Sequence, residues 1–367
     1  MKKIRVAING FGRIGRAFLK VARKRQEIEV VAINDLGDIK NFAYLLKYDS
    51  VYGQSSFDVV ADEKKGVLVI DGQEVQFISE KDPTKLPWKS LGIDIVIEST
   101  GLFTSAEKAQ AHITAGAKRV VITAPIKDAE VGSRTSATVL MGMNEDKLDG
   151  CVISSNASCT TNAGAPLIAI LDETIGVEKA LLNTVHAYTA SQALIDGPSK
   201  KDLREGRAAA QNIVPSSTGA AIAVTKAFPQ LEGKFDGISI RVPVVCGSIV
   251  DITFVAKHHT TIEEVNGILK KAADDPRWNG IFTVTEEPLV SSDIVGNKHA
   301  SIADLTFTRV VGGDLVKVLA WYDNEIGYTH TLVRHVIAAA SYLLPEEEGR
   351  QMRINAGIWT NGRDGQK

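Results

Sequence analysis

Cysteine is scarce in this chain of 367 residues, which contains three: Cys151, Cys159 and Cys246. So few and so scattered cysteines exclude a disulfide framework and a zinc cluster, and we expect no metal site. Long apolar runs are also missing, because none approaches the roughly 18 residues of a membrane span. A strand-like stretch begins at residue 4, so we expect no signal peptide. These absences predict a cytoplasmic protein in a reducing compartment, without a membrane partner.

An excess of charge of either sign is equally absent. The formal net charge is −2, and acidic and basic residues are mixed along the chain. We therefore expect no nucleic-acid partner. The length predicts two domains with substantial cores.

The first half of the chain alternates strand-like and helix-like stretches. Strands are expected at 4–9, 29–35, 67–70, 74–78, 94–99 and 119–124, and helices at about 12–24 and 105–115. Apolar strands interleaved with helices indicate an α/β domain with a parallel sheet covered on both faces.

From about residue 180 the strands become longer and closer to alternating. We expect them at 180–188, 237–245, 249–256, 304–311 and 315–322, followed by a long helix at about 327–343. They are separated mainly by turns and two helices, which predicts an α+β domain on a mostly antiparallel sheet. The polar, glycine-rich stretch 345–367 lacks periodicity and is expected to be a mobile tail.

A glycine-rich turn follows the first strand and opens the first helix. In NGFGRIGR (9–16), Gly10, Gly12 and Gly15 have the G-x-G-x-x-G spacing of a dinucleotide fingerprint. These glycines permit a tight turn, close approach of a pyrophosphate and close packing of helix on strand. Asp35, about 20 residues on, would bind the adenosine ribose and repel a 2′-phosphate. This part of the chain is therefore predicted to bind NAD rather than NADP.

Cys159 stands between a short apolar run and a helical pattern, in SSNASCTTNAG (154–164). A helix N-terminus favours a thiolate, so Cys159 is a candidate nucleophile with a lowered pKa. The alternative is a half-buried cysteine in a capping turn. A nucleophilic thiol needs a base, and His186 at the end of a strand is the candidate. By itself a histidine at a strand end is more often structural.

Eight stretches strengthen this interpretation because they occur together and in order: NGFGRIGR (9–16), ESTGLF (98–103), SNASCTTN (155–162), HAYTASQ (186–192), DGPS (196–199), STGAA (217–221), RVPV (241–244) and WYDNEIGY (321–328). Over residues 3–344 the chain thereby resembles the phosphorylating glyceraldehyde-3-phosphate dehydrogenases. The resemblance implies a homotetramer with a Rossmann-type NAD-binding domain and an α+β catalytic domain. It implies boundaries at 1–157 for the NAD-binding domain, 158–326 for the catalytic domain, 327–344 for a helix returning to the first domain, and 345–367 for the tail.

The resemblance also implies a reaction. Cys159 attacks the aldehyde of glyceraldehyde 3-phosphate, His186 takes the proton, NAD is reduced, and inorganic phosphate cleaves the thioester to 1,3-bisphosphoglycerate. The residues matched to cofactor contacts are Gly10, Gly12, Arg13, Ile14, Gly15, Asp35, Lys81, Thr123 and Asn324. Those matched to two anion sites are Thr189, Arg204 and Arg241 for one, and Ser158, Thr160, Thr218 and Gly219 for the other. Arginine suits phosphate because its forked donors make charge-assisted bonds.

Departures from the family pattern are few. Ala163 replaces a second cysteine that many members carry four residues after the nucleophile, so we expect no internal disulfide with Cys159. Residues 126–147 are longer than the usual connection, and we expect a loop insertion there.

Three alternatives stay open at this point. Erythrose-4-phosphate dehydrogenases share the cysteine and cofactor, although that branch tends to carry Glu at the position of Asp35. Semialdehyde dehydrogenases share the architecture but usually favour NADP and need no doubled phosphate site. From another class, the chain could be an NAD-dependent redox sensor or binding protein with a reactive Cys159.

Overall fold

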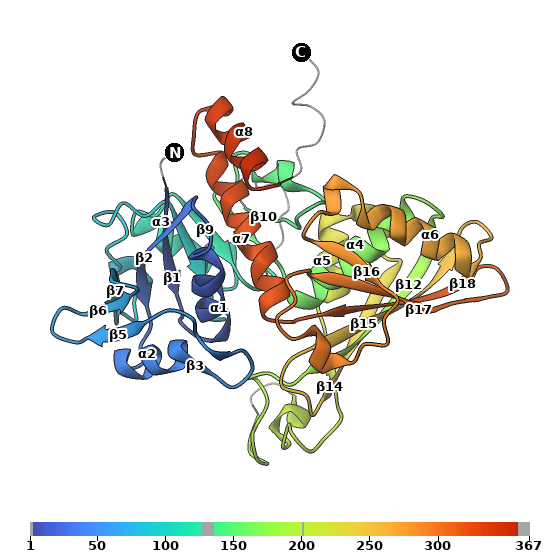
Figure 1. Cartoon of the computed structure of the whole chain (residues 1–367), viewed down its shortest axis with the longest axis horizontal. Helices are drawn as coiled ribbons and strands as arrows, with labels where there is room; N and C mark the ends of the chain where they lie inside the picture. The colour runs from blue at the N-terminus through green and yellow to red at the C-terminus, as the bar shows by residue number, and fades with distance from the viewer. Residues whose placement is uncertain (1–2, 127–135, 200–201, 359–367) are drawn as a thin grey trace. The chain divides into compact units, whose positions relative to one another are not determined.

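The computed structural model describes residues 3–126, 136–199 and 202–358. The chain divides into two compact units, unit 1 (Met1–Ala157 with Leu332–Lys367) and unit 2 (Ser158–Thr331). Helix α7, Ile326–Ser341, begins in unit 2 and continues into unit 1 (Figure 1). None of the helices within the described ranges combines the length and hydrophobicity that crossing a membrane requires.

Unit 1 is built on a nine-stranded sheet in the order β10-β11-β9-β8-β1-β2-β7-β6-β5. Its strands are β1 (Ile4–Asn9), β2 (Ile28–Asn34), β5 (Val59–Asp62), β6 (Val67–Ile70), β7 (Gln73–Ile78), β8 (Ile95–Glu98), β9 (Arg119–Ile122), β10 (Ser136–Thr138) and β11 (Ile153–Ser155). The central strands are apolar and buried, and they pair in parallel from β10 to β7, as the sequence predicts.

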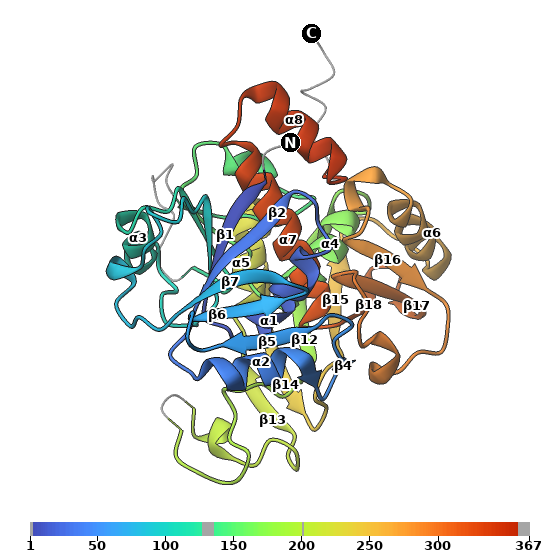
Figure 2. The same ribbon diagram turned by 60° about the vertical axis from the view of Figure 1, so that its left-hand side comes forward.

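The sheet departs from the expected parallel arrangement at one edge. Strands β5, β6 and β7 pair antiparallel, and Figure 2 shows them side by side beyond β2. The turn between β6 and β7 consists of Asp71 and Gly72, which have φ angles of +47° and +77°. Two residues with positive φ make the tight hairpin turn that an Asp-Gly pair favours. That dipeptide is the signal that could have predicted the hairpin.

Several helices of unit 1 pack against this sheet. The helices of the unit are α1 (Arg13–Ala22), α2 (Ile39–Lys47), α3 (Ala106–Thr114), part of α7, and α8 (Glu346–Asn355). Helix α1 contacts β2, α2 contacts β5, and α3 contacts β9 and β11. The short strands β3 (Tyr48–Asp49) and β4 (Gly53–Gln54) pair with each other.

Two expectations about irregular segments need correction. The stretch expected as a mobile tail contains helix α8, whose Met352 is fully buried and whose Arg353 donates to the Ser341 hydroxyl at 2.8 Å. Residues 359–367 lie outside the described residues. In the segment expected as a loop insertion, 127–135 also lie outside them, but Ser136–Thr138 forms strand β10 at the edge of the sheet.

Unit 2 is a seven-stranded sheet in the order β13-β14-β12-β15-β18-β17-β16. Its strands are β12 (Val177–Ala187), β13 (Val214–Ser217), β14 (Phe235–Val242), β15 (Ser248–Ala256), β16 (Phe282–Thr285), β17 (Ser301–Val311) and β18 (Leu315–Tyr322). Only β12 with β14 and β16 with β17 pair in parallel, so the sheet is mostly antiparallel. Helices α4 (Cys159–Asp172), α5 (Ala220–Ala227) and α6 (Ile262–Ala273) pack on it (Figure 1). The expected fold class, an α/β unit and an α+β unit, is confirmed.

Candidate active site

The glycine-rich turn of unit 1 has the geometry that its three glycines suggest. Gly10 has a φ of +95°, and a Cβ there would lie 2.6 Å from the backbone N of Thr100. A Cβ on Gly15 would lie 2.2 Å from the Gly10 carbonyl oxygen, so only glycine lets α1 pack so closely on the turn. Around Gly12 nothing lies within 4 Å of that position. The start of α1 is therefore open, and a helix N-terminus is a natural site for a pyrophosphate.

Asp35 lies directly after β2 and closes the same turn from the other side. Its carboxylate accepts hydrogen bonds from the backbone N–H groups of Phe11 at 2.6 Å and Gly37 at 3.1 Å. Beside it is a cavity of about 420 Å³. The cavity is lined by Asn9, Gly10, Gly12, Asn34, Asp35, Leu36, Glu80, Lys81, Pro83, Ser99, Thr100, Leu102 and Phe103. This set combines an open glycine turn, a carboxylate and apolar walls, which fits the pyrophosphate, ribose and adenine of NAD.

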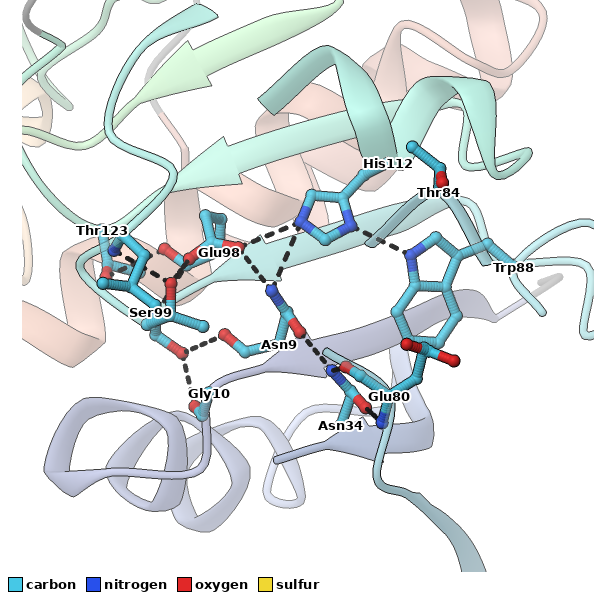
Figure 3. A network of polar contacts seen from close by, with 12 residues as sticks. Asn9, Gly10, Asn34, Glu80, Thr84, Trp88, Glu98, Ser99, His112 and Thr123 are labelled. Atoms are coloured by element: carbon cyan, nitrogen blue, oxygen red, sulfur yellow. Dashed lines mark hydrogen bonds and ion pairs between the residues drawn. The ribbon is translucent and has the colours of Figure 1, made fainter. Parts of the chain in front are cut away.

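A buried polar network includes Asn9 and Asn34, which line this cavity (Figure 3). The carboxylate of Glu98 accepts from Asn9 Nδ2 at 2.6 Å and from Thr100 N at 2.9 Å, and lies 3.0 Å from His112 Nε2. Because the indole N–H of Trp88 donates to His112 Nδ1 at 3.1 Å, Nε2 carries the proton and donates to Glu98. The buried carboxylate of Glu98 thus accepts hydrogen bonds from three residues, which offsets the cost of burying its oxygens.

The sequence analysis missed this network. Its signal is a polar residue at the end of each of three apolar parallel strands, namely Asn9, Asn34 and Glu98. The carboxyl ends of parallel strands meet at one edge of a sheet, so such residues come together. Asn34 completes the set by donating to Asn9 Oδ1 at 2.7 Å and to the Glu80 carbonyl at 2.9 Å.

The remaining cofactor candidates of unit 1 are placed as follows. Arg13 is the first residue of α1 and Ile14 the second, and the Arg13 side chain pairs with Asp49 at 3.0 Å. Lys81 lines the cavity. Thr123 follows β9, and its hydroxyl donates to the Glu98 carbonyl at 3.1 Å.

Cys159 is the first residue of helix α4 in unit 2. The helix is capped by Ser158, whose hydroxyl oxygen accepts from the Thr161 N–H at 3.1 Å. The polar residues around the cysteine are thus explained by the cap that starts the helix. Cys159 is half-buried, whereas Cys151 and Cys246 are each 2% exposed. Cys159 is therefore the thiol that a reagent or substrate can reach.

His186 lies near the end of β12 and faces this thiol. Its Nε2 is 3.3 Å from Cys159 Sγ, and its Nδ1 is 2.7 Å from the Ala187 carbonyl oxygen. The Ala187 carbonyl can only accept and the Arg241 guanidinium can only donate, so their contacts with Nδ1 favour opposite tautomers. With the proton on Nδ1, the carbonyl is satisfied and Nε2 presents its lone pair to the thiol. Arg241 contacts the same ring nitrogen and donates to the Ala187 carbonyl at 3.2 Å. The ring of Tyr322 packs edge-on against the imidazole at 5.9 Å.

The electrostatics of this pair differ from the expectation. Burial lowers the pKa of His186 to about 3, and the positive charge of Arg241 acts in the same direction. Burial raises the pKa of Cys159, although Arg241 and hydrogen bonds from Thr160 oppose this. The expected lowering of the thiol pKa is therefore wrong for this geometry. At neutral pH the pair is a thiol and a neutral imidazole, with the base already aimed at the S–H proton.

The anion candidates fall into two groups by position. Arg241 lies beside His186, and the buried Thr160 hydroxyl is 2.9 Å from the hydroxyl of Tyr322. Burial raises the pKa of Tyr322, so this phenol stays neutral. By contrast, Arg204 pairs with Asp202 at 2.7 Å and is 61% exposed on its side chain. The structure does not bring Arg204 into contact with Arg241.

The other candidates have local contacts of their own. The Thr189 hydroxyl is 3.1 Å from the Ser191 hydroxyl, and the Thr218 hydroxyl accepts from Ala220 N at 3.1 Å. Gly219 is the N-cap of helix α5, directly before its first residue, Ala220. Thr218 and Gly219 thus form the N-terminus of that helix.

Asn324 follows β18 and is buried, with 6% exposure. Its Oδ1 accepts from Gly247 N and from the Ser248 hydroxyl, both at 3.1 Å. The neighbouring Asp323 accepts from the N–H groups of Glu325 and Ile326, each at 2.8 Å, at the start of α7. The sequence analysis singled out Asn324 but missed the residues that fix it.

A dinucleotide-binding unit and a second unit with a thiol–imidazole pair at a helix N-terminus together fit an NAD-dependent oxidoreductase. Residues 4–106 match the model of the glyceraldehyde 3-phosphate dehydrogenase NAD binding domain, and residues 158–324 match that of the C-terminal domain of the same enzyme. The chain belongs to the glyceraldehyde-3-phosphate dehydrogenase family.

Full-length relatives support the same assignment. The chain is 48% identical over 333 residues to glyceraldehyde-3-phosphate dehydrogenase of Streptomyces coelicolor, covering 90% of this chain and 96% of the relative. It is also 48% identical over 335 residues to the enzyme of Clostridium acetobutylicum, with coverages of 90% and 96%. Glyceraldehyde-3-phosphate dehydrogenase of Eremothecium gossypii is 48% identical over 339 residues, with coverages of 91% and 99%.

Proposed function

We propose that the protein is a phosphorylating glyceraldehyde-3-phosphate dehydrogenase. It oxidises D-glyceraldehyde 3-phosphate with NAD and inorganic phosphate to 1,3-bisphosphoglycerate. The observation that carries the proposal is the pair Cys159 and His186, 3.3 Å apart, with Arg241 beside the imidazole. A nucleophile, a base and a fixed cation within one unit are what acyl chemistry on a phosphorylated aldehyde requires.

The first step is addition of the thiol to the aldehyde. As the sulfur of Cys159 bonds to the aldehyde carbon, His186 Nε2 takes the S–H proton and passes it to the aldehyde oxygen, which gives a hemithioacetal. Because Arg241 lowers the basicity of His186, an anion bound to Arg241 would offset that charge and restore it. The base is therefore strongest when the phosphorylated substrate is in place.

When bound, NAD would supply the acceptor for a hydride from the hemithioacetal carbon. His186 Nε2 takes the hydroxyl proton in this step, and a thioester remains on Cys159. We propose that NAD is held by Gly10, Gly12, the start of α1 with Arg13 and Ile14, Asp35, Lys81, Thr123 and, in unit 2, Asn324. An oxygen of inorganic phosphate then attacks the thioester carbon. The C–S bond breaks, the acyl phosphate leaves, and the Cys159 thiolate recovers its proton from His186.

The two phosphate groups need separate donors. We assign Thr189, Arg204 and Arg241 to one anion, and Ser158, Thr160, Thr218 and Gly219 to the other. Thr218 and Gly219 at the start of α5 support the second assignment, since N–H groups at a helix N-terminus favour an anion. Arg204 would exchange its exposed carboxylate partner, Asp202, for phosphate.

We further propose a homotetramer. Helices α4, α5 and α6 cover one face of the unit 2 sheet, while Leu181, Ile238 and Leu315 are exposed on its strands. Leu194, Ile195 and Leu203, in the connection after β12, are 77–84% exposed. Large apolar side chains gathered in this way are typical of surfaces covered by another subunit. Because a catalytic thiol needs a reducing compartment, we place the enzyme in the cytoplasm.

Phosphate dependence tests the proposed reaction. Enzyme, NAD and glyceraldehyde 3-phosphate mixed without inorganic phosphate should give a burst of about one NADH per active site, as acyl-enzyme accumulation requires. Steady turnover should begin when phosphate is added. Thr218→Ala should keep the burst and slow the steady phase. A full steady rate without phosphate would contradict the proposal, because water would then resolve the thioester, as in erythrose-4-phosphate dehydrogenases.

A further inference from the structure

Ser248 is a buried residue between the backbone next to His186, the proposed base, and Asn324, a proposed cofactor contact. It is the first residue of β15 and is 1% exposed. Its hydroxyl oxygen is 3.1 Å from the backbone N of Ala187, next to His186, and 3.1 Å from Asn324 Oδ1.

The direction of each hydrogen bond follows from the partners. The Ala187 N–H can only donate, so the Ser248 oxygen accepts there, and its single proton goes to Asn324 Oδ1. Gly247 N donates to the same oxygen at 3.1 Å, which fixes which end of the amide is oxygen. The NH₂ group of Asn324 therefore faces away from the strand. A ligand at this amide meets a donor and must supply an acceptor, as the carboxamide oxygen of nicotinamide does.

The backbone of Ala187 links Ser248 to the base through two consecutive peptide groups, the 186–187 peptide that carries its N–H and the 187–188 peptide that carries its carbonyl. Its N–H is held by Ser248, and its carbonyl accepts from His186 Nδ1 at 2.7 Å. That second bond favours the imidazole tautomer with the proton on Nδ1, in which Nε2 accepts from Cys159 at 3.3 Å. One chain of hydrogen bonds thus runs from Asn324 through Ser248 and Ala187 to the thiol–imidazole pair.

The backbone that carries Ser248 cannot easily shift. Gly247 has a φ of +89°, and a Cβ there would lie 2.3 Å from the Ser291 carbonyl oxygen. The preceding Cys246 donates its S–H to Asp323 at 3.3 Å. The segment before β15 is thus tied to the segment after β18 on both sides of Gly247.

We propose that Ser248 is a positioning residue that sets the Asn324 amide and the His186 imidazole together. The proposal rests on the proposed function, because it assigns Asn324 to the cofactor and His186 to the thiol. It goes beyond that function by coupling the two residues. A single change at Ser248 should both weaken NAD binding and lower the reaction rate of the Cys159 thiol.

Ser248→Ala tests this coupling, with Ser301→Ala as the matched control. Ser301 is 0% exposed, lies in the same sheet, and its hydroxyl has no hydrogen-bond partner among the described residues. Each variant deletes one buried hydroxyl, but only the first should leave the Ala187 N–H without an acceptor. Two quantities are measured on the full chain: the dissociation constant of NAD, and the rate of Cys159 alkylation by iodoacetamide without cofactor.

Ser248→Ala should weaken NAD binding about tenfold and slow alkylation at neutral pH several-fold, in the range that one unsatisfied buried hydrogen bond produces. Ser248→Thr, which keeps the hydroxyl, should recover much of both. Ser301→Ala should leave both at wild-type values, whatever it does to thermal stability. Wild-type NAD binding and alkylation in Ser248→Ala, or equal losses in Ser301→Ala, would overturn the proposal.

Failure of the proposed function would look different. If the wild-type chain did not oxidise glyceraldehyde 3-phosphate, the burst experiment would show it. NAD binding and alkylation would still report whether Ser248 couples Asn324 to His186.

Discussion

Cys159 Sγ lies 3.3 Å from His186 Nε2, and both side chains are neutral at neutral pH. The pair is therefore a donor and an acceptor rather than a preformed thiolate and imidazolium. In this arrangement the S–H proton moves to His186 as the sulfur attacks. His186 therefore raises the rate of attack without holding Cys159 as a thiolate beforehand. Several consequences of this relationship can be measured.

Iodoacetamide should label Cys159 in preference to Cys151 and Cys246, because these two are buried. Since the pKa of Cys159 is raised, its labelling rate in the protein without substrate should keep rising above roughly pH 8.5, where a free cysteine levels off. Mass spectrometry locates the label. Cys159→Ser should fold and bind NAD but lose oxidation, and preferential labelling of Cys151 or Cys246 would contradict the assignment.

His186→Asn should keep the fold and slow acylation by about 10²–10⁴-fold, the usual contribution of a general base. The pre-steady-state burst of NADH measures acylation directly. Equal burst rates in the variant and the wild type would reduce His186 to a packing residue.

Asp35→Gly should weaken NAD binding and admit NADP, because the carboxylate that would bind the ribose hydroxyls and repel a 2′-phosphate is removed. Since Asp35 also accepts from Phe11 N, part of the loss reflects a looser turn. The ratio of kcat/KM for the two cofactors isolates the charge effect, because loosening alone weakens both. A wild-type enzyme that already uses both cofactors equally would refute the charge argument.

Arg204→Ala should raise the KM for glyceraldehyde 3-phosphate or for phosphate by about tenfold, as loss of a charge-assisted bond predicts. Arg207→Ala is a matched control. Both side chains are 61% exposed, and each pairs with one aspartate, Asp202 at 2.7 Å or Asp196 at 2.8 Å. If both variants behaved alike in steady-state kinetics, the assignment of Arg204 to an anion site would fail.

Acid should destabilise the fold through a buried histidine that takes no part in the reaction. His335 is 0% exposed and 2.7 Å from the Ser154 hydroxyl, and burial lowers its pKa to about 3. Unfolding restores an ordinary pKa of roughly 6.5, so between these values the unfolded chain binds more protons. The free energy of unfolding should therefore fall as pH drops from about 6.5 towards 3, with His335 contributing up to about 1.4 kcal/mol per pH unit.

The variant His335→Asn isolates this contribution. Its thermal midpoint should depend less steeply on pH over that window than that of the wild type, even if it is lower at pH 7. His258→Asn, at an exposed position, serves as the control. An unchanged slope in His335→Asn would show that His335 does not limit stability in acid.

The sequence predicted those elements whose apolar pattern is strong. Strands 4–9, 67–70 and 315–322 are found at the expected residues, since buried strands give continuous or alternating apolar runs. Helix α8 was missed because its sequence, EEEGRQMRIN, has few apolar residues. It is instead supported by three acidic residues in its first turn and by buried Met352.

The site was predictable where chemistry requires a local motif. The glycine spacing and the cysteine at a helix start are local, and the structure shows the geometry that both suggest. The partners were not predictable in the same way. Glu98 meets Asn9 across 89 residues, and Ser248 meets Asn324 across 76. The raised pKa of Cys159 was also missed, because burial depends on the whole unit rather than on the helix terminus.

Cys159 is accessible whereas Cys151 and Cys246 are buried, and this difference determines how the enzyme responds to oxidation. A peroxide that reaches Cys159 would produce a sulfenic acid, which a second thiol normally resolves as a disulfide. Cys151 and Cys246 are each 2% exposed, and their sulfurs contact the Ile153 carbonyl and Asp323. Position 163 is alanine. Recovery of the oxidised enzyme therefore depends on a small thiol supplied from outside, and where none is present the damage proceeds to the irreversible sulfinic and sulfonic acids.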